Sequence, residues 1–352
     1  MTPSPDRARD SPSSDDAALP AVLVSRDAVA RGRRADLRAG YVRAAHGVHV
    51  AAGTSLADAD VRIAVAAAGA PPSVTIGGWV AARLHEKRVI GRHGRGGSRR
   101  PASRSTAEVP FFDGVSASGR PALLPVLLLA PREVRLTARP GQRLLRSRVS
   151  PDERVLVDGI PVTAPVRTAF DVARTAGIED AVAGLDRLRA LGLLDVEELA
   201  GLVRRRGGWR GVGAARRALA LSADGVESPQ ESRMRLVWLA AGLPVPRCNP
   251  VVLDADGRFV ARVDVLDESS GLVAEYDGAV HSGADRRSAD ADRQERLHAV
   301  GIEVLRATSA DLATPTSRAR WQARALAARR RALERRPRAR WHVARDPGSR
   351  AP

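Results

Sequence analysis

The sequence predicts a multidomain α/β (α+β) protein, and three observations lead to this prediction. Its 352 residues suggest about two domains at roughly 150 residues each. With 44% hydrophobic residues the chain can bury a sizeable core, which argues against wholesale disorder. In the second half, a helix with apolar residues at i, i+3, i+4 and i+7 precedes short apolar strands, a further helix and another strand.

The composition restricts the partners and the compartment. The net charge is +17 and the pI about 11.4, and Lys87 is the only lysine, so nearly all the positive charge is arginine. Arginine binds phosphate well, which favours a nucleic-acid partner, although a GC-rich genome also produces arginine-rich chains. Aromatic residues make up only 3%, which argues against an open surface for base stacking.

Cysteine and hydropathy point to a cytoplasmic protein. Cys248 is the only cysteine, so an internal disulfide and a zinc site with two or more thiolates are excluded, and a reducing cytoplasm fits. No apolar run approaches about 18 residues, so we expect no membrane span.

Changes in composition divide the chain. We expect a disordered leader over 1–18, because it is rich in Pro, Ser and Asp and lacks the apolar segment of a signal peptide. The further divisions are a DNA-binding unit over 19–55, an α/β connector over 56–222 with a basic Gly/Ser-rich loop at 91–107, a legible α/β unit over 224–315, and a basic helix and tail over 318–352.

The pattern of the first unit predicts helix, turn, helix and wing. Ser25 can cap a helix that runs to Ala30, a second short helix fits 33–39, and two short strands can pair around 45–47. This order is typical of a winged helix-turn-helix. A small helical cap with a hairpin is the alternative. The candidate DNA-binding residues are Arg31, Arg33, Arg34, Arg38 and Arg43.

Two stretches carry a resemblance to a known family. LVSRDAVARG followed by GYVRAAHGVHV resembles the N-terminal winged helix of AbiEi-type antitoxins, with His49 where the family pattern has tyrosine. DGIPVTAPVRTAFDVAR, at 158–174, resembles the segment that follows in the same proteins. The resemblance implies DNA binding, often in repression, and a toxin–antitoxin or defence partner; it carries no catalytic chemistry.

The second half has a clear pattern of predicted helices and strands. The spacing predicts a helix over 228–241, strands over 251–253, 259–266 and 272–277, a helix over 288–300 and a strand over 302–307. A turn is expected at Asp254-Ala255-Asp256-Gly257.

Strand alternation places carboxylates together. Glu275 and Asp277 share one face of their strand, and Asp264 lies opposite Glu275 if the intervening hairpin loop holds an even number of residues. Three carboxylates that converge repel one another, and a divalent cation such as Mg²⁺ or Mn²⁺ is the usual remedy. Such a metal can activate water and neutralise a phosphate.

The same region resembles the PD-(D/E)xK nuclease superfamily, and specifically its domain related to very-short-patch-repair endonucleases. The resemblance rests on FVARVDVLDESSGLVAEYDGAVH and DADRQERLHAVGIEVLRAT and covers 226–312. It implies a restriction-endonuclease-like mixed sheet flanked by helices, with Asp264 and Glu275 as metal-binding acids. Asp277 stands where the family has lysine and is a further candidate metal ligand, and His281 is a candidate proton carrier. The zinc site of the repair relatives needs thiolates that this chain lacks.

Structural interpretations remain open for several of these residues. Glu231 follows Ser228 by three residues, so it either completes a capping box or takes part in catalysis. Asp277-Gly278 can be a plain turn, and His281 an ordinary loop histidine. Asp264 and Glu275 lie in apolar surroundings, where an unpaired carboxylate is costly, so a functional role is favoured for both.

Nearby basic residues also have simple interpretations. Asp290 and Arg293, at i, i+3 spacing, most simply form a pair on a helix surface, and Arg306 a structural salt link. The loop at 91–107 and the arginines at 329–331 can follow a nucleic-acid backbone or remain solvated.

The function expected from the sequence is metal-dependent hydrolysis of DNA phosphodiesters, with an N-terminal winged helix that binds DNA. The alternative is a DNA-binding repressor or antitoxin-like protein whose nuclease-like domain is inert. The retained acids favour the enzyme, and the absent lysine favours the alternative.

Overall fold

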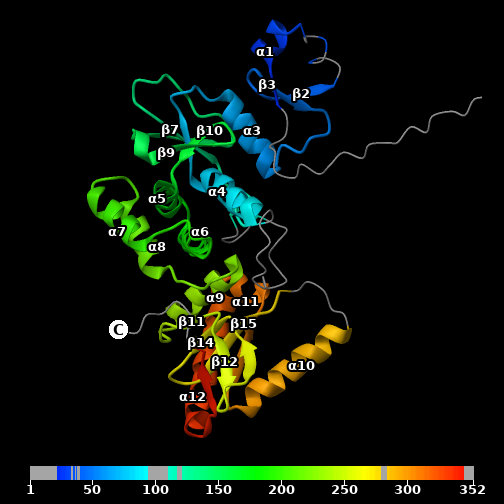
Figure 1. The fold of residues 1–352 in the computed structure, drawn as a ribbon, viewed down its shortest axis with the longest axis vertical. Helices are drawn as coiled ribbons and strands as arrows, with labels where there is room; N and C mark the ends of the chain where they lie inside the picture. The colour runs from blue at the N-terminus through cyan, green and yellow to red at the C-terminus, as the bar shows by residue number, and fades with distance from the viewer. Residues whose placement is uncertain are drawn as a thin grey trace, which may run out of the picture. The chain divides into compact units, whose positions relative to one another are not determined.

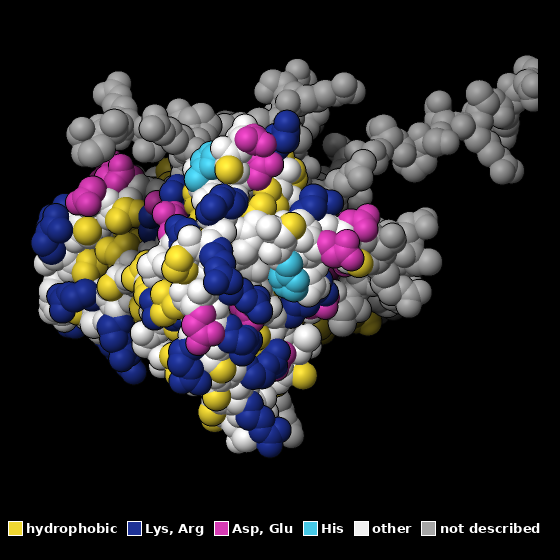
Figure 2. All heavy atoms as spheres, turned by 90° about the horizontal axis from the view of Figure 1, so that it is seen from below, with side chains coloured by type: hydrophobic (Ala, Val, Ile, Leu, Met, Phe, Trp, Pro, Cys, Tyr) yellow, Lys and Arg dark blue, Asp and Glu magenta, His cyan; other side chains and the backbone are white. Residues whose placement is uncertain are grey.

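A computed structural model describes residues 22–32, 35, 37, 40–93, 110–116, 121–278 and 284–344, and it has the mixed α/β character expected from the sequence (Figure 1). The chain forms two compact units, one within 1–71 and 87–100 and the other within 72–86 and 101–352. Many Lys and Arg side chains and fewer acidic ones cover the face seen in Figure 2, as the net charge of +17 implies. Among the described residues, no helix is long and apolar enough to cross a membrane.

Several predicted features lie outside the described residues. They are the leader at 1–18, the loop at 91–107 beyond residue 93, His281, and the arginines Arg33, Arg34 and Arg38.

The first unit contains a helix followed by a hairpin. Its elements are β1 (Leu23–Val24), α1 (Ser25–Ala30), β2 (Tyr41–Ala45), β3 (Val48–Ala51) and α3 (Ala59–Gly69). The predicted hairpin is present as an antiparallel β2–β3 pair, and β1 adds a third strand against β3. The prediction that Ser25 caps α1 is wrong: the cap position is Val24, and the Ser25 hydroxyl lies 3.4 Å from His49 Nδ1.

The first part of the second unit is a five-stranded mixed sheet with helices. The strand order is β8-β7-β4-β10-β9. Its elements are β4 (Thr75–Gly77), α4 (Gly78–His93), β5 (Val115–Ser116), β6 (Ala122–Leu123), β7 (Val126–Ala130), β8 (Gln142–Arg146), β9 (Arg154–Val157), β10 (Ile160–Thr163), α5 (Pro165–Thr175), α6 (Ile178–Ala190), α7 (Val196–Arg205) and α8 (Val212–Leu221). The three residues of β4 are buried, and β4 forms the middle strand of this sheet.

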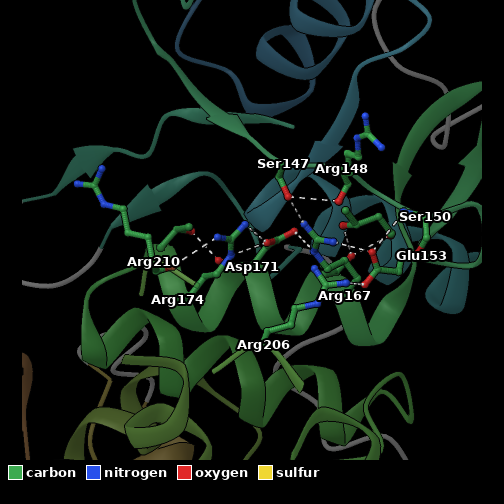
Figure 3. Close-up of polar contacts among 12 residues, drawn as sticks. Ser147, Arg148, Ser150, Glu153, Arg167, Asp171, Arg174, Arg206 and Arg210 are labelled. Carbon is green, nitrogen blue, oxygen red and sulfur yellow. Dashed lines mark hydrogen bonds and ion pairs between the residues drawn. The ribbon is translucent and has the colours of Figure 1, made fainter. Parts of the chain in front are cut away.

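A buried ionic network fixes the helices that follow this sheet (Figure 3). Arg167, only 1% exposed, donates to Glu153 at 2.7 Å and to Asp171 at 3.1 Å. Asp171 also pairs with Arg174 at 2.7 Å, and Arg206 pairs with Glu153. Because burial of an unpaired charge is costly, this set of mutual partners determines how α5 and the end of α7 pack against the start of β9.

The rest of the second unit has two sheets with the strand orders β11-β14-β15-β16 and β13-β12-β17. Its elements are α9 (Pro229–Ala240), β11 (Arg247–Cys248), β12 (Val251–Asp254), β13 (Phe259–Arg262), β14 (Val265–Asp267), β15 (Leu272–Tyr276), α10 (Ala284–Ala299), β16 (Glu303–Ala307), α11 (Ser309–Ala313), α12 (Pro315–Arg335) and β17 (Trp341–Val343). The first of these sheets is mixed, because β15 and β16 are parallel and the other pairs antiparallel.

The predicted single strand over 259–266 is wrong. The chain bends at Val263 and Asp264, so that β13 pairs with β12 in one sheet and β14 pairs with β11 and β15 in the other. A strand that serves two sheets must turn between them. The bend takes Asp264 out of the strand and leaves it at the edge where the two sheets separate.

Within the described residues, which end at 344, the predicted basic helix and tail that begins at 318 is an integral part of the core. Trp321 is fully buried in the cluster that contains Met234 and Trp238 of α9, and β17 pairs with β12. Arg329 pairs with Asp267, and Arg331 and Arg335 pair with Glu303. Arg329 is thus partly buried in its ion pair, whereas Arg331 and Arg335 contribute ion pairs to the fold and still remain exposed.

A buried ion pair joins α6 to α9. Arg235 donates to Asp186 at 3.1 Å, and the two side chains are 2% and 1% exposed. Asp186 also accepts from Ser232 at 2.8 Å and from the N–H of Ala223 at 2.7 Å. The contact holds α6 against α9, the helix that leads into the last part of the chain.

We predict that Asp186→Asn lowers the free energy of unfolding by about 3–5 kcal/mol, because it leaves Arg235 buried without a counter-charge. The matched control is Asp224→Asn: Asp224 pairs with Arg189 but its side chain is 81% exposed, so its loss costs about 1 kcal/mol or less. Urea denaturation of the full chain measures both. Equal, small losses would contradict a structural role for the buried pair.

Candidate functional site

The pairing of β14 with β15 brings the predicted acids together. The loop between these strands holds four residues, an even number, and the aligned pairs are Val265 with Ala274, Leu266 with Val273 and Asp267 with Leu272. Asp264 immediately precedes β14, at the bend, and Glu275 follows Ala274 in β15, so the two acids lie at the same end of this strand pair.

A cavity of about 170 Å³ opens at this edge of the sheet. Its lining residues come from the bend after β13, the end of β15, the residue that follows it, α10 and β16. They are Asp264, Glu275, Tyr276, Asp277, Asp290, Arg293 and Arg306. The cavity therefore gathers four acids and two arginines around one small space.

Glu275 is held by an arginine from α10. It is 8% exposed, and Arg293 donates to its Oε2 at 2.7 Å. Arg293 Nη2 lies 2.5 Å from Glu275 Oε1 but outside hydrogen-bond geometry, so this buried oxygen has no hydrogen bond. The same nitrogen donates to the backbone carbonyl of Arg262 at 2.5 Å. Arg293 thus connects α10, β13 and the acid in β15.

Asp264 carries the strongest electrostatic signature of the site. Burial raises the pKa of its carboxyl group to about 7, and the negative charges of Glu231 and Glu275 add to this effect. The N–H of Tyr276, which donates to Asp264 Oδ2 at 2.7 Å, and the charge of Arg293 oppose it. Asp264 is therefore poised to change protonation near neutral pH.

The pKa of the Arg293 guanidinium is also raised. Burial lowers its pKa, but the hydrogen bond and charge of Glu275, with the charges of Asp264 and Asp290, outweigh burial and raise the pKa overall. Arg293 therefore stays positively charged beside the acids.

Glu231 lies at the start of α9 and supports the bend that carries Asp264. Its N–H donates to Ser228 Oγ at 3.2 Å, while its Oε2 accepts from the N–H of Glu227 at 3.0 Å. Ser228 therefore caps α9 as predicted, but the capping box is only half formed, because the Glu231 side chain accepts from the N–H of Glu227 and not from that of Ser228. The same oxygen accepts from the Asn249 amide at 2.6 Å, and the N–H of Asn249 donates to the carbonyl of Asp264 at 2.8 Å.

Asp277 faces Arg306 and is exposed. Its Oδ2 lies 3.6 Å from Arg306 Nη1, and Arg306 aligns with Glu275 across the parallel β15–β16 pair. Among the described residues, no group of three or more His, Cys, Asp or Glu side chains is arranged to hold a metal ion. Asp264, Glu275 and Asp277 therefore line one cavity without forming the expected metal-holding cluster, and Arg293 and Arg306 lie against Glu275 and Asp277.

Sequence reasoning missed Arg293 as part of the site. Its interpretation as half of a surface pair with Asp290 is wrong, because Arg293 lies against Glu275. A signal was present: Leu297, one turn later, is 1% exposed and marks the inward face of α10. Of the predicted DNA-binding residues within the described part of the chain, Arg31 and Arg43 are both exposed.

Two curated proteins of Mycobacterium tuberculosis, one from strain H37Rv and one from strain CDC 1551 / Oshkosh, are similar to this chain. Each is described as uncharacterized and is 32% identical over 150 residues, which is 42% of this chain and 55% of the relative. The chain thus spans about half the length of these relatives. No family model and no solved structure matches.

The raised pKa of Asp264 predicts how stability changes with pH. The folded state keeps a proton that the unfolded chain loses near its ordinary pKa of about 4, so stability falls as the pH rises from there to about 7. Asp264→Asn removes this loss. In EDTA, the difference in melting temperature between the variant and the wild type should therefore shift in favour of the variant as the pH rises from about 5 to about 8.

Asp256→Asn is the control, because Asp256 lies in an exposed turn, and this variant should follow the pH profile of the wild type. A constant difference between Asp264→Asn and the wild type at all pH values would mean that Asp264 does not titrate in this range.

Proposed function

We propose that the last part of the second unit is a metal-dependent nuclease domain that hydrolyses DNA phosphodiester bonds. One observation carries the proposal: Asp264, at the bend that precedes β14, and Glu275, in the neighbouring β15, line one small open cavity, although both are partly or largely buried. A protein seldom holds two acids so close at a cost in stability unless they serve a function. The resemblance to restriction-endonuclease-like domains gives these two acids a role as metal ligands.

The donor groups suit a hard cation. Asp264 and Glu275 offer only oxygen ligands; Glu275 Oε1 makes no hydrogen bond but lies 2.5 Å from Arg293 Nη2 in their ion pair. Mg²⁺ is commonly held by one or two carboxylates, with water and substrate phosphate completing its shell, so a third protein carboxylate is not required. When bound, such a cation lowers the pKa of a water molecule and neutralises phosphate charge.

The arginines of the cavity provide the positive charge that the absent lysine would supply. Arg293 is fixed against Glu275, while Arg306 has only a long contact with Asp277 and a partly exposed side chain. Arg306 is thus the group able to contact a phosphate oxygen of the substrate, since guanidinium groups match phosphate geometry. Arg293 holds Glu275 in position.

DNA is the proposed substrate because the chain is strongly basic and its first unit pairs a short helix with a hairpin. In this proposal the first unit is a winged helix-turn-helix that binds the duplex through Arg31 and Arg43, and the sheet with strand order β8-β7-β4-β10-β9 belongs to a connector. Backbone contacts of this kind position a protein on DNA without specifying sequence.

A second function has an observation in its favour. Arg293 already neutralises Glu275, so the acid pair has less need of a metal. With no lysine beside the site, this arrangement also suits a DNA-binding repressor whose nuclease-like domain is inert and acts as a scaffold. The two functions differ in whether cleavage occurs.

Plasmid cleavage distinguishes the two functions. With Mg²⁺ or Mn²⁺ the wild type should nick supercoiled plasmid, and Asp264→Asn and Glu275→Gln should each lose at least about a hundredfold in rate because the metal site is lost. Asp256→Asn should cleave like the wild type. A wild type that binds DNA but never nicks it, with either metal, would establish the repressor alternative.

The first unit should contribute to duplex affinity by neutralising phosphates. We predict that the double variant Arg31→Ala, Arg43→Ala weakens binding and flattens the dependence of log K on log salt by about 0.9 for each phosphate that is no longer neutralised. Fluorescence anisotropy of a labelled duplex measures both quantities on the full chain. Arg258→Ala, an exposed arginine of the second unit, is the control. An unchanged salt slope in the double variant would remove these two arginines from the DNA interface.

A further inference from the structure

A second cavity, of about 210 Å³, lies in the second unit and shares no lining residue with the carboxylate cavity. Three aromatic side chains line it, together with two small residues of α6 and β5 and one buried arginine of α9. They are Trp79, Phe111, Phe112, Ala183, Val115 and Arg233. This gathering of rings was not expected from a chain with 3% aromatic residues.

Hydrogen bonds to residues outside the cavity hold its aromatic residues in place. Trp79 Nε1 donates to the carbonyl of Pro125 at 3.0 Å. The N–H of Phe112 donates to the fully buried Glu86 at 3.2 Å, and its carbonyl accepts from Arg83 at 3.0 Å. The two phenylalanine rings meet edge to face with centroids 4.9 Å apart. The cavity is therefore preformed, and a ligand need not pay to order its walls.

Arg233, on the polar side of the cavity, makes only long hydrogen bonds. Arg233 is 6% exposed, yet its hydrogen bonds to Gln230 and Asp180 are both 3.3 Å long. Its Nε has no hydrogen bond, and the oxygen paired with it, on Glu179, is 3.9 Å away. A buried guanidinium with long contacts gains from a further acceptor within reach.

Charges around this arginine balance. Arg233 and Arg318 are positive, and Glu179 and Asp180, with which they pair, are negative. Asp113 at the rim is exposed, and its carboxylate accepts from the N–H of Val115. A charged ligand would disturb this balance, whereas a neutral ligand with an acceptor edge would not.

We propose that this cavity binds a neutral planar heterocycle of the size of a single nucleobase. Aromatic walls bind the ring faces, and Arg233 and Gln230 offer hydrogen bonds to its edge. The volume falls below the roughly 300 Å³ at which sites for larger ligands begin, which suits one base rather than a dinucleotide. The base can come from a free nucleoside or from a nucleic-acid strand. The inference needs neither metal nor cleavage.

The test titrates the full chain, in EDTA, with guanosine, adenosine, cytidine and uridine, followed by calorimetry and tryptophan fluorescence. At least one nucleoside should bind saturably. Ala183→Leu, which fills the cavity, should weaken binding about tenfold or more. The matched control is Ala190→Leu, on the same helix but exposed, and it should bind like the wild type.

Two further variants keep the test decisive. Val115→Phe fills the cavity from its half-buried rim and should also weaken binding if Ala183→Leu fails to fold. Trp79→Phe should weaken the calorimetric binding and lose the fluorescence change, since it removes ring surface from the cavity and the hydrogen bond to Pro125 that fixes this wall. No saturable binding of any of the four nucleosides to the wild type, or unchanged binding in a folded filled variant, would overturn the proposal.

A competition experiment identifies the source of the base. A short single-stranded oligonucleotide that displaces the nucleoside, when its abasic counterpart does not, assigns the cavity to a base within a strand. Bound nucleoside that resists displacement assigns it to a free heterocycle.

Discussion

Two carboxyl groups that lie side by side at the edge of a sheet repel each other when both are ionised, and nearby positive groups must neutralise them. Asp264 and Glu275 are in this position, and Arg293 serves Glu275 directly. Asp264 is left with a backbone N–H and a pKa near 7. Three local features produce this arrangement: the bend between β13 and β14, the inward face of α10 and the cap of α9. The chemistry of the site depends on the repulsion between the two carboxylates, which Arg293 relieves at Glu275.

Much of the last part of the chain follows from local rules that a single sequence contains. Ser228 caps α9, and its apolar face, which includes Met234 and Trp238, is buried as helical spacing predicts. An even hairpin loop and two-residue alternation are sufficient to bring Asp264 and Glu275 to the same end of the β14–β15 pair, although the bend takes Asp264 out of the strand. These predictions depend only on neighbours along the chain or across one hairpin.

The remaining features depend on contacts between distant residues. The split of the strand at Asp264 arises because β12 and β15 belong to different sheets, and the return of β17 to β12 joins residues about ninety positions apart. The aromatic cavity joins Trp79, Phe112 and Arg233 in the same way. Local periodicity contains no information on contacts between residues that are distant in the sequence. The low aromatic content is also a poor guide, because the fold brings a few aromatic rings together in one cavity.

The central claim, that Asp264 and Glu275 together hold a divalent cation, can be tested through protons. A cation that binds Asp264 must displace its proton at a pH just below about 7. Calorimetric titration with Mg²⁺ in two buffers of different ionisation enthalpy counts the protons released. We expect saturable binding with release of nearly one proton in the wild type and none in Asp264→Asn. Absence of binding, or binding without proton release, would contradict the account.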